Sequence, residues 1–287
     1  HKIPFHFTST DEMLQKAKPD VVSVCTPPQT HKQVVLDVVR AGINAFVEKP
    51  LALNYSDALE IVNEAKARGV KLWVTRTYLF TPTMMKAKKL VDGGAIGRLN
   101  RADLMVYAPR EVILGADGGW LSSLPGGAFG EVLPHPIYII QRFLGRLQLI
   151  SAEFRRLSNS SWMSYDSLHV LLRGERGLGR IIVCYNALDF DMYLLVEGDR
   201  GVLIVNPLGK IVAKLGSSAK YLRNLFSLKP YLLMGLEWAL GKLTRDPLVQ
   251  NIKIFVQHIE RGTPLDPDLD FILNLAQVYD EVLHKVR

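Results

Sequence analysis

Short apolar runs alternate with amphipathic segments over the first 76 residues. The run Val21-Val22-Ser23-Val24-Cys25 has almost no polar positions, which is typical of a parallel strand covered on both faces. Residues 30–41 and 55–68 carry apolar side chains at helical spacing, and a glycine follows each segment. Strands that are joined by single helices form right-handed crossovers, so this part predicts a doubly wound parallel sheet. The remaining elements predicted here are strands at 3–7, 45–47 and 72–74 and a helix between 9 and 19.

The rest of the chain has a different pattern, with a helix at 82–91 followed by a series of strands. Gly198-Asp199-Arg200-Gly201 has the composition of a hairpin turn, so consecutive strands are expected to be antiparallel. We therefore predict two domains, a doubly wound one at 1–76 and an α+β domain at 77–287 with a large, mainly antiparallel open sheet. The predicted strands are 99–107, 148–156, 167–173, 179–186, 192–197 and 202–205, and the predicted helices are 217–227, 231–243, 247–261 and 268–285.

The amino-acid composition limits which kinds of binding partner and which cellular compartment we expect for the protein. Apolar residues make up 48% and charged residues 22%, which supports a sizeable core and excludes a mainly disordered chain. The net charge of +7 is not concentrated in an arginine-rich arm, so we do not expect nucleic acid as a partner. Two cysteines form no disulfide framework, which favours a cytoplasmic setting. Charged residues and Pro230 interrupt the most apolar stretch, 221–240, so stable membrane insertion is not expected.

The stretch from Arg200 to Leu236 is basic. It holds six positive charges and no acidic residue. One interpretation is a surface for an anionic sugar nucleotide or an acidic membrane. The interpretation we favour is a pair of packed helices with a solvated basic rim.

Candidate chemistry lies where the predicted parallel strands end, because ligands of such sheets bind outside the carboxyl ends. These ends are Thr26-Pro27-Pro28, Glu48-Lys49-Pro50 and Arg76-Thr77. In the second, a buried strand leads directly into an adjacent acid and base. Taken alone, Glu48-Lys49 is more typical of a solvated turn than of a functional pair.

A second candidate follows the glycine pair Gly126-Gly127. Glu131 and His135 are four residues apart, so in a helix both side chains would lie on one face. A carboxylate beside an imidazole can orient it and set its tautomer, as in a general acid or base. Without context such a pair is more often a surface pair. No third ligand stands at a recognised spacing, so no metal site is expected.

Taken in order, these motifs resemble those of the Gfo/Idh/MocA oxidoreductases, the family of glucose–fructose oxidoreductase and inositol dehydrogenase. The resemblance implies a Rossmann domain followed by an open-sheet domain that also forms a homo-oligomer. It also implies hydride transfer between a nicotinamide cofactor, NAD or NADP, and a hydroxyl of a sugar, sugar derivative or cyclitol. The segments that carry it are 21–28 with His31, 47–51, 90–97, Trp120, Gly126-Gly127 with Glu131 and His135, and 198–201.

The resemblance also implies roles for individual residues. His135 would be the acid/base that removes the hydroxyl proton, Lys49 would stabilise the developing charge, and Glu131 would hold His135. Glu48 and Lys49 would reach the nicotinamide ribose and the substrate hydroxyl. The full set of expected cofactor-binding residues is Thr26, Pro27, His31, Glu48, Lys49 and Arg76.

The chain departs from the family pattern in three places. Glu131 stands where the family usually has Asp, and Leu133-Pro134 precede the histidine where a glycine is common. No GxGxxG occurs, so the opening strand and its phosphate-binding turn are absent. We expect on the order of 50–60 residues before His1 in the intact protein, and poor NAD binding by these residues alone.

Two other functions fit the same motifs. One is an NAD-dependent glycosidase of related fold, which uses transient oxidation to eliminate a leaving group. The other is a non-catalytic sugar-binding or sensor protein. Presence of Lys49 and His135 together favours the oxidoreductase.

Overall fold

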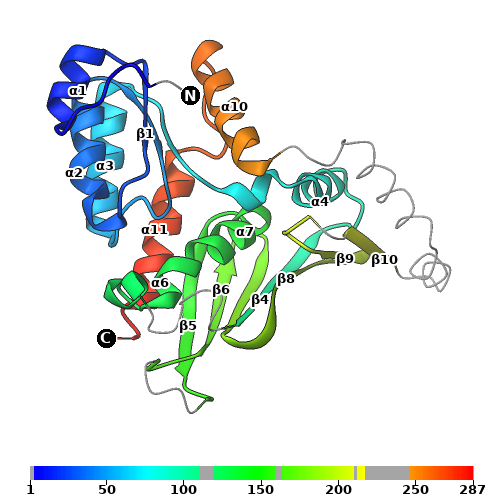
Figure 1. Cartoon of the computed structure of the whole chain (residues 1–287). Coiled ribbons are helices and arrows are strands. Elements are labelled where there is room, and N and C mark those ends of the chain that lie inside the picture. The colour runs from blue at the N-terminus through cyan, green and yellow to red at the C-terminus, as the bar shows by residue number, and fades with distance from the viewer. Residues whose placement is uncertain (1–2, 110–118, 159–162, 210–211, 217–245, 287) are drawn as a thin grey trace. The chain divides into compact units, whose positions relative to one another are not determined.

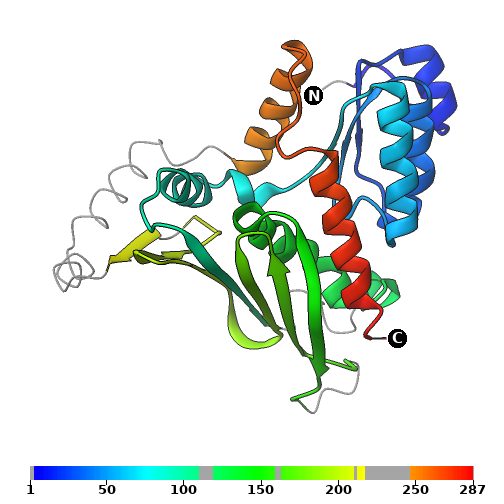
Figure 2. The same cartoon turned by 180° about the vertical axis from the view of Figure 1, so that it is seen from behind.

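A computed structural model describes residues 3–109, 119–158, 163–209, 212–216 and 246–286 (Figures 1 and 2). The chain forms two compact units. The first combines residues 1–75 with 251–280, and the second combines residues 76–250 with 281–287. The segment 251–280 therefore folds with the first unit, a return of the chain that the local sequence pattern does not indicate.

The first unit is built on a three-stranded parallel sheet in the order β1-β2-β3. Val24 is aligned with Val47, and Val47 with Val74, so the three strands end together. The elements are α1 (Thr10–Ala17), β1 (Val21–Val24), α2 (Pro28–Arg40), β2 (Asn44–Val47), α3 (Tyr55–Arg68) and β3 (Leu72–Val74), with α10 (Pro247–Glu260) and α11 (Leu269–Leu283) returning later.

Helices α2 and α3 lie side by side against the sheet (Figure 1). Their apolar stripes are fully buried, as Val35 and Val39 of α2 and Ile61 and Val62 of α3 show. A further aromatic cluster joins strands β2 and β3 to α10. Phe255 packs 5.8 Å from Phe46 and 5.9 Å from Trp73 between ring centres, and Trp73 Nε1 donates to Asn251 Oδ1 at 2.8 Å.

The ends of the first helices follow the expected local chemistry. Ser9 caps α1 by accepting a hydrogen bond from the Glu12 N–H at 3.4 Å. The strand predicted at 3–7 is wrong, because these residues have no regular structure. Ile3 and Phe5 remain 81% and 66% exposed, so burial does not stabilise an extended segment there.

The second unit carries a seven-stranded sheet in the order β10-β9-β8-β4-β7-β6-β5. Every neighbouring pair is antiparallel except β4 and β7, so the predicted mainly antiparallel sheet is confirmed. The expectation that consecutive strands pair fails at two places. Strand β4 does not pair with β5, and β7 does not pair with β8, because β4 lies between β7 and β8. The strands are β4 (Leu99–Pro109), β5 (Leu147–Arg155), β6 (Ser167–Gly174), β7 (Gly177–Cys184), β8 (Asn186–Gly198), β9 (Gly201–Val205) and β10 (Val212–Gly216). The helical elements are η1 (Thr77–Phe80), α4 (Pro82–Asp92), η2 (Gly119–Ser123), α6 (Ala128–Val132) and α7 (Pro134–Leu144).

Helix α7 packs against one face of this sheet, over β4 and β7 (Figure 2). The approach is close at Gly179 of β7, where an added Cβ would lie 2.8 Å from Ile140 and 3.1 Å from Leu144. A larger residue would push the helix away from the sheet. This contact fixes α7, and the residues at its N-terminus, relative to the strands.

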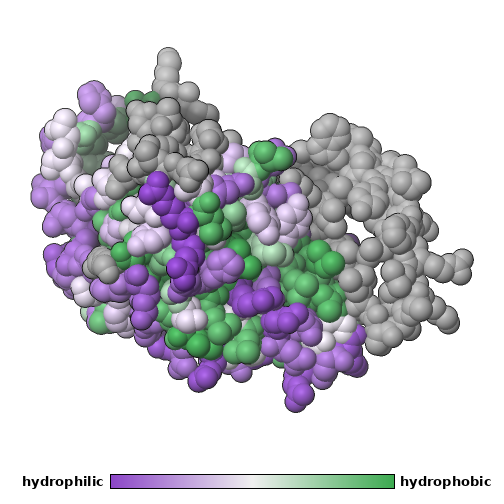
Figure 3. All heavy atoms as spheres, turned by 90° about the horizontal axis from the view of Figure 1, so that it is seen from below, coloured by the Kyte–Doolittle hydropathy of each residue, from purple (hydrophilic) through white to green (hydrophobic). Residues whose placement is uncertain are grey.

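The opposite face of the sheet is exposed. Leu178 and Tyr193 project there and keep 48% and 41% of their surface in contact with solvent. Exposed apolar side chains are ordinary on protein surfaces. Seen from below, the molecule presents both hydrophobic and hydrophilic residues (Figure 3).

Two of the predicted helices, 217–227 and 231–243, lie outside the described residues, with much of the basic stretch from Arg200 to Leu236. Among the helices that the structure describes, none has both the length and the apolar character that crossing a bilayer requires.

Candidate functional site

Glu48 and Lys49 follow directly after β2, and Thr75 follows β3. The Thr75 hydroxyl donates to Glu48 Oε2 at 2.9 Å, and the Lys49 N–H donates to Thr75 Oγ1 at 3.2 Å. The same N–H lies 3.4 Å from Glu48 Oε2. The Glu48 carboxylate and the Lys49 backbone are therefore tied to the end of the neighbouring strand, and both residues are half-buried.

His31 lies in the first turns of α2 and is fully enclosed. Its Nδ1 is 2.8 Å from the Pro50 carbonyl oxygen, and its Nε2 is 2.7 Å from the Thr26 carbonyl oxygen. The ring thus joins the segment after β1 to the segment after β2. Thr26 and Pro27 are exposed at the same edge of the sheet.

Arg76 begins the second unit and is 1% exposed. It directly follows Thr75 and precedes η1. Its assignment to the cofactor site stays a prediction. The sequence pattern showed only its place after a strand and gave no sign of its burial.

Glu131 and His135 do not lie in one helix as predicted. Glu131 belongs to α6 and His135 to α7, and Leu133 ends one helix and caps the next. Pro134 causes the interruption, because it has no N–H to donate to the preceding turn. The backbone stays close to helical across the junction, since the Leu133 N–H donates to the Phe129 carbonyl at 2.8 Å.

His135 is half-buried and contacts two tyrosines. Its Nδ1 lies 2.9 Å from the hydroxyl oxygen of Tyr138, a fully buried residue one turn later on α7. The same hydroxyl oxygen accepts a hydrogen bond from the Tyr78 N–H at 3.3 Å. The Tyr78 ring packs edge-on to the imidazole, with 4.9 Å between ring centres. These contacts fix the plane of the histidine ring.

The charge of Glu131 affects buried hydroxyls nearby. Burial raises the pKa of the Tyr78 hydroxyl, and the negative charge of Glu131 raises it further. Burial and Glu131 act in the same direction on the pKa of Tyr185, whose hydroxyl donates to the Ala128 carbonyl at 2.8 Å. Both tyrosines are therefore neutral hydrogen-bonding groups at physiological pH.

Sequence reasoning missed both tyrosines that contact His135. For Tyr138 a signal was present, because residues three apart on a helix lie on one face and Tyr carries a hydroxyl. For Tyr78 there was none, since its contact arises from the tertiary packing of η1 against α7.

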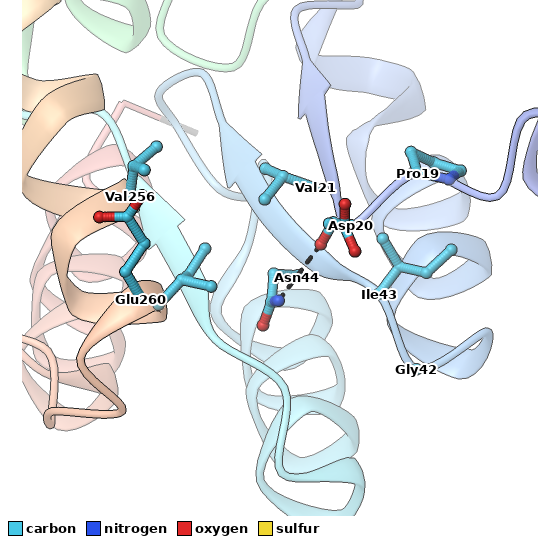
Figure 4. Close-up of a pocket in the computed structure, with 9 residues that line it drawn as sticks. Pro19, Asp20, Val21, Gly42, Ile43, Asn44, Val256 and Glu260 are labelled. Atoms are coloured by element: carbon cyan, nitrogen blue, oxygen red, sulfur yellow. Dashed lines mark hydrogen bonds between the residues drawn. The ribbon is translucent and has the colours of Figure 1, made fainter.

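A cavity of about 520 Å³ lies in the first unit, at the amino ends of β1 and β2 (Figure 4). The Asn44 side-chain amide donates to the Asp20 carbonyl at its wall. The predicted cofactor residues Thr26, Glu48 and Lys49 stand at the other ends of these strands, so the cavity is separate from them. Within the described part of the chain, no group of three or more acidic, histidine or cysteine residues could hold a metal ion.

Comparison with known families agrees with both units. A model described as an oxidoreductase family with an NAD-binding Rossmann fold matches residues 2–76. A second model, the GFO/IDH/MocA C-terminal domain, matches residues 84–204. The chain belongs to the Gfo/Idh/MocA oxidoreductase family. The resemblance inferred from the motifs is therefore confirmed.

Relatives within the Gfo/Idh/MocA family are distant in sequence. Oxidoreductase P35 of Formosa agariphila is 25% identical over 70% of this chain, and the match spans 64% of that protein. The chain thus covers less than two thirds of that relative's length. Myo-inositol 2-dehydrogenase of Thermotoga maritima is 23% identical over 88% of this chain and 73% of its own. A levoglucosan dehydrogenase structure with NADH and levoglucosan superposes with a TM-score of 0.76 at 17% identity, covering 98% of this chain and 82% of that one. At this identity the superposition shows the shared fold.

Proposed function

We propose that the intact protein is an oxidoreductase that transfers hydride between NAD or NADP and a hydroxyl group of a sugar, sugar derivative or cyclitol. The observation that carries this proposal is the fixed Glu48-Lys49 pair at the carboxyl ends of β2 and β3. It stands where parallel sheets bind nucleotide cofactors, in a chain of the Gfo/Idh/MocA family.

The residues at this edge fit a nicotinamide cofactor. Thr26 and Pro27 are exposed, so they can contact a ligand, and α2 begins at Pro28 with its positive dipole end toward the same edge. The Glu48 carboxylate can accept a hydrogen bond from a ribose hydroxyl while it also accepts one from the Thr75 hydroxyl. Lys49 supplies a positive charge beside it. These residues would hold the cofactor's ribose and nicotinamide end.

The chain's own residues then handle the proton and the charge. A bound nicotinamide cofactor would supply the acceptor for the hydride that leaves the carbon bearing the hydroxyl. In our proposal the Nδ1–H of His135 donates to the Tyr138 hydroxyl oxygen, so Nε2 is the unprotonated nitrogen and removes the hydroxyl proton. Lys49 would stabilise the negative charge that develops as the proton leaves. The alcohol would become a carbonyl, and the proton of its hydroxyl would reside on His135. Glu131 would hold His135 in place, and its negative charge would act on the groups around the imidazole.

Names of relatives support the substrate class. They include a myo-inositol 2-dehydrogenase and a levoglucosan dehydrogenase, which act on a cyclitol and a sugar derivative. We propose a substrate of this class, a cytoplasmic location in keeping with two free thiols, and a homo-oligomer formed through the exposed face of the large sheet.

A second candidate is an enzyme that uses the same hydride transfer only transiently. A 2,7-anhydro-N-acetylneuraminate hydratase of Mediterraneibacter gnavus is 34% identical over 32% of this chain. In the NAD-dependent glycosidase predicted from the motifs, the cofactor would be reduced and reoxidised within one turnover, so no reduced cofactor would accumulate.

The test is a screen of the full-length protein against free sugars, polyols, cyclitols and glycosides with NAD or NADP. Accumulation of reduced cofactor in proportion to a carbonyl product supports the dehydrogenase. Product formation without net reduction supports the second candidate instead. Sugar binding with neither reaction would show a non-catalytic binding protein and overturn the proposal.

A further inference from the structure

His31 is the one described histidine that is fully enclosed and has a carbonyl oxygen within hydrogen-bond distance of each ring nitrogen. The distances, 2.8 Å to Pro50 and 2.7 Å to Thr26, both fall within the ordinary hydrogen-bond range. The imidazole lies between two segments that are 24 residues apart in the chain. It is the side-chain link between the ends of β1 and β2.

The chemistry of the two partners restricts the ring. A backbone carbonyl oxygen only accepts hydrogen bonds. A neutral imidazole has a single N–H, so its other nitrogen would place a lone pair against an oxygen lone pair at this distance. With a proton on each nitrogen, the ring donates to both oxygens. Charge-assisted hydrogen bonds of this kind are stronger than neutral ones and offset the loss of hydration on burial.

We propose that His31 is a positioning residue, a doubly donating bridge that fixes the backbone of Lys49 through Pro50 and that of Pro27 through Thr26. It does so without touching the cofactor. Burial of the ring and occupation of both nitrogens leave no polar atom of His31 for a ligand. This role differs from the cofactor contact that the family resemblance implies.

The bridge completes a connected series of hydrogen bonds across the sheet. Thr26 follows β1, Pro50 follows β2, and Thr75 follows β3. His31 links the first two, and the Lys49 N–H and Glu48 carboxylate link the second to Thr75. The backbone around Lys49 is therefore held at two points. The Lys49 N–H donates to Thr75, and the carbonyl of the next residue, Pro50, contacts His31.

Charged groups on neighbouring elements are paired with other partners. Lys32, next to His31 on α2, contacts Asp57 of α3 at 2.6 Å and Glu60 at 2.9 Å. The Glu48 carboxylate accepts from Thr75. The two carbonyl oxygens are the acceptors that the structure provides for the His31 ring.

The protonation of the ring is tested directly on the wild-type, full-length protein. Ring-nitrogen NMR shifts of His31 at neutral pH, assigned with a His31→Gln variant, should show two protonated nitrogens. Exposed His169 on β6 serves as the internal reference for a solvated ring. A neutral tautomer at His31, with one protonated nitrogen, would overturn the doubly donating bridge. This measurement requires neither turnover nor cofactor, so it is independent of the proposed function.

The positioning role is tested by hydrogen exchange and kinetics. Gln has two donors on a single terminal nitrogen and cannot bridge both carbonyls, so His31→Gln should raise amide exchange at Lys49 and in its neighbouring residues by about 5- to 150-fold. The matched control, His169→Gln, should leave exchange there unchanged. In kinetic assays His31→Gln should raise the KM for NAD and lower kcat together. Both the binding of the cofactor and the placement of Lys49 depend on the carboxyl-end edge of the parallel sheet. Unchanged exchange at Lys49 in a folded His31→Gln protein would contradict the proposal.

Discussion

The hydroxyl oxygen of Tyr138 lies 2.9 Å from Nδ1 of His135, one helical turn away on α7. A tyrosine hydroxyl can donate one hydrogen bond and accept two. It already accepts one from the Tyr78 N–H, so its position is set by the backbone of η1 as well as by its own helix. Tyr138 is therefore a fixed partner for the imidazole. Glu131, the partner that the sequence predicts, lies in the preceding helix.

His135→Ala is expected to lower kcat by roughly 10²–10⁴-fold in the full-length protein, the usual contribution of a general acid or base. NAD affinity should stay nearly unchanged, because the proposed role of His135 is on the substrate hydroxyl and not on the cofactor. Steady-state kinetics and calorimetry with NAD measure the two effects separately. Near wild-type kcat with the same pH dependence would show that His135 is not the base, and Lys49 would become the leading candidate.

Tyr138→Phe removes the hydroxyl that contacts Nδ1 and keeps the ring that fills the core. Loss of one hydrogen bond of about 1 kcal/mol corresponds to a decrease in kcat of roughly fivefold. The pH–rate profile should shift as well, because the imidazole loses a partner that favours one of its protonation states. Tyr107→Phe, on the exposed sheet face, is the control and should change neither. A wild-type pH profile for Tyr138→Phe would show that the hydroxyl has only a packing role.

Glu131→Gln tests the electrostatic connection to Tyr78. Removal of the negative charge should lower the ionisation midpoint of Tyr78, while burial, the larger cause, keeps the pKa above its ordinary value. Ultraviolet titration of wild type and variant, with Tyr78→Phe to assign the signal, measures the difference. Activity should fall less than in His135→Ala, because the amide keeps an acceptor oxygen. An unchanged ionisation midpoint for Tyr78 would show that the charge of Glu131 does not act on the Tyr78 hydroxyl.

Much of the fold follows from local sequence patterns. The parallel sheet was predictable because β1 is mainly apolar and each crossover helix has a regular apolar stripe that is followed by a glycine. The large sheet was predictable as strands, but its order was not. The pairing of β4 with both β7 and β8 depends on contacts between residues about 80–100 positions apart, which no local pattern records.

The residues of the candidate site could be proposed from the sequence, but most of their hydrogen-bond partners could not. The position of Glu48-Lys49 after a buried strand marked the edge of the sheet, yet their link to Thr75 depends on the register of β2 and β3. His31 was marked by a family motif, but burial and its two carbonyl partners appear only when β1, α2 and β2 are assembled. Pro134 was visible in the sequence as a helix interruption and explains why Glu131 and His135 are separated.

Leu178→Glu should weaken the proposed homo-oligomer. Leu178 lies on the exposed face of the large sheet, where a contact would remove its apolar surface from water. A charge at this position would have to be desolvated on association, so sedimentation should show a smaller species at the same concentration. Met85→Glu replaces an apolar residue of α4 that is equally exposed and serves as the control. If the wild-type protein is monomeric, or if Leu178→Glu assembles normally, this face is not the contact surface.

Asp166 provides a pH-dependent contribution to the stability of the second unit. Its Oδ1 and Oδ2 each accept a backbone hydrogen bond at 2.8 Å, from Leu157 and Ser158, and the residue is fully buried. Burial pushes the pKa of Asp166 upward, but hydrogen bonds from the Ser158 and Leu157 region outweigh it, and the pKa lies below its ordinary value.

Because the folded state binds the Asp166 proton less tightly than the unfolded chain, the carboxylate stabilises the fold at neutral pH. This contribution should disappear as the pH falls below about 4 and through the lowered pKa of the folded state. Asp166→Asn replaces one acceptor with an N–H₂ donor that faces a backbone N–H, so it should cost about 1–3 kcal/mol at neutral pH. The difference between variant and wild type should shrink in acid. Urea unfolding at several pH values measures it, with Asp189→Asn at an exposed site of β8 as the control. A stability difference that stays constant down to the lowest accessible pH would show that the Asp166 carboxylate is not the group responsible.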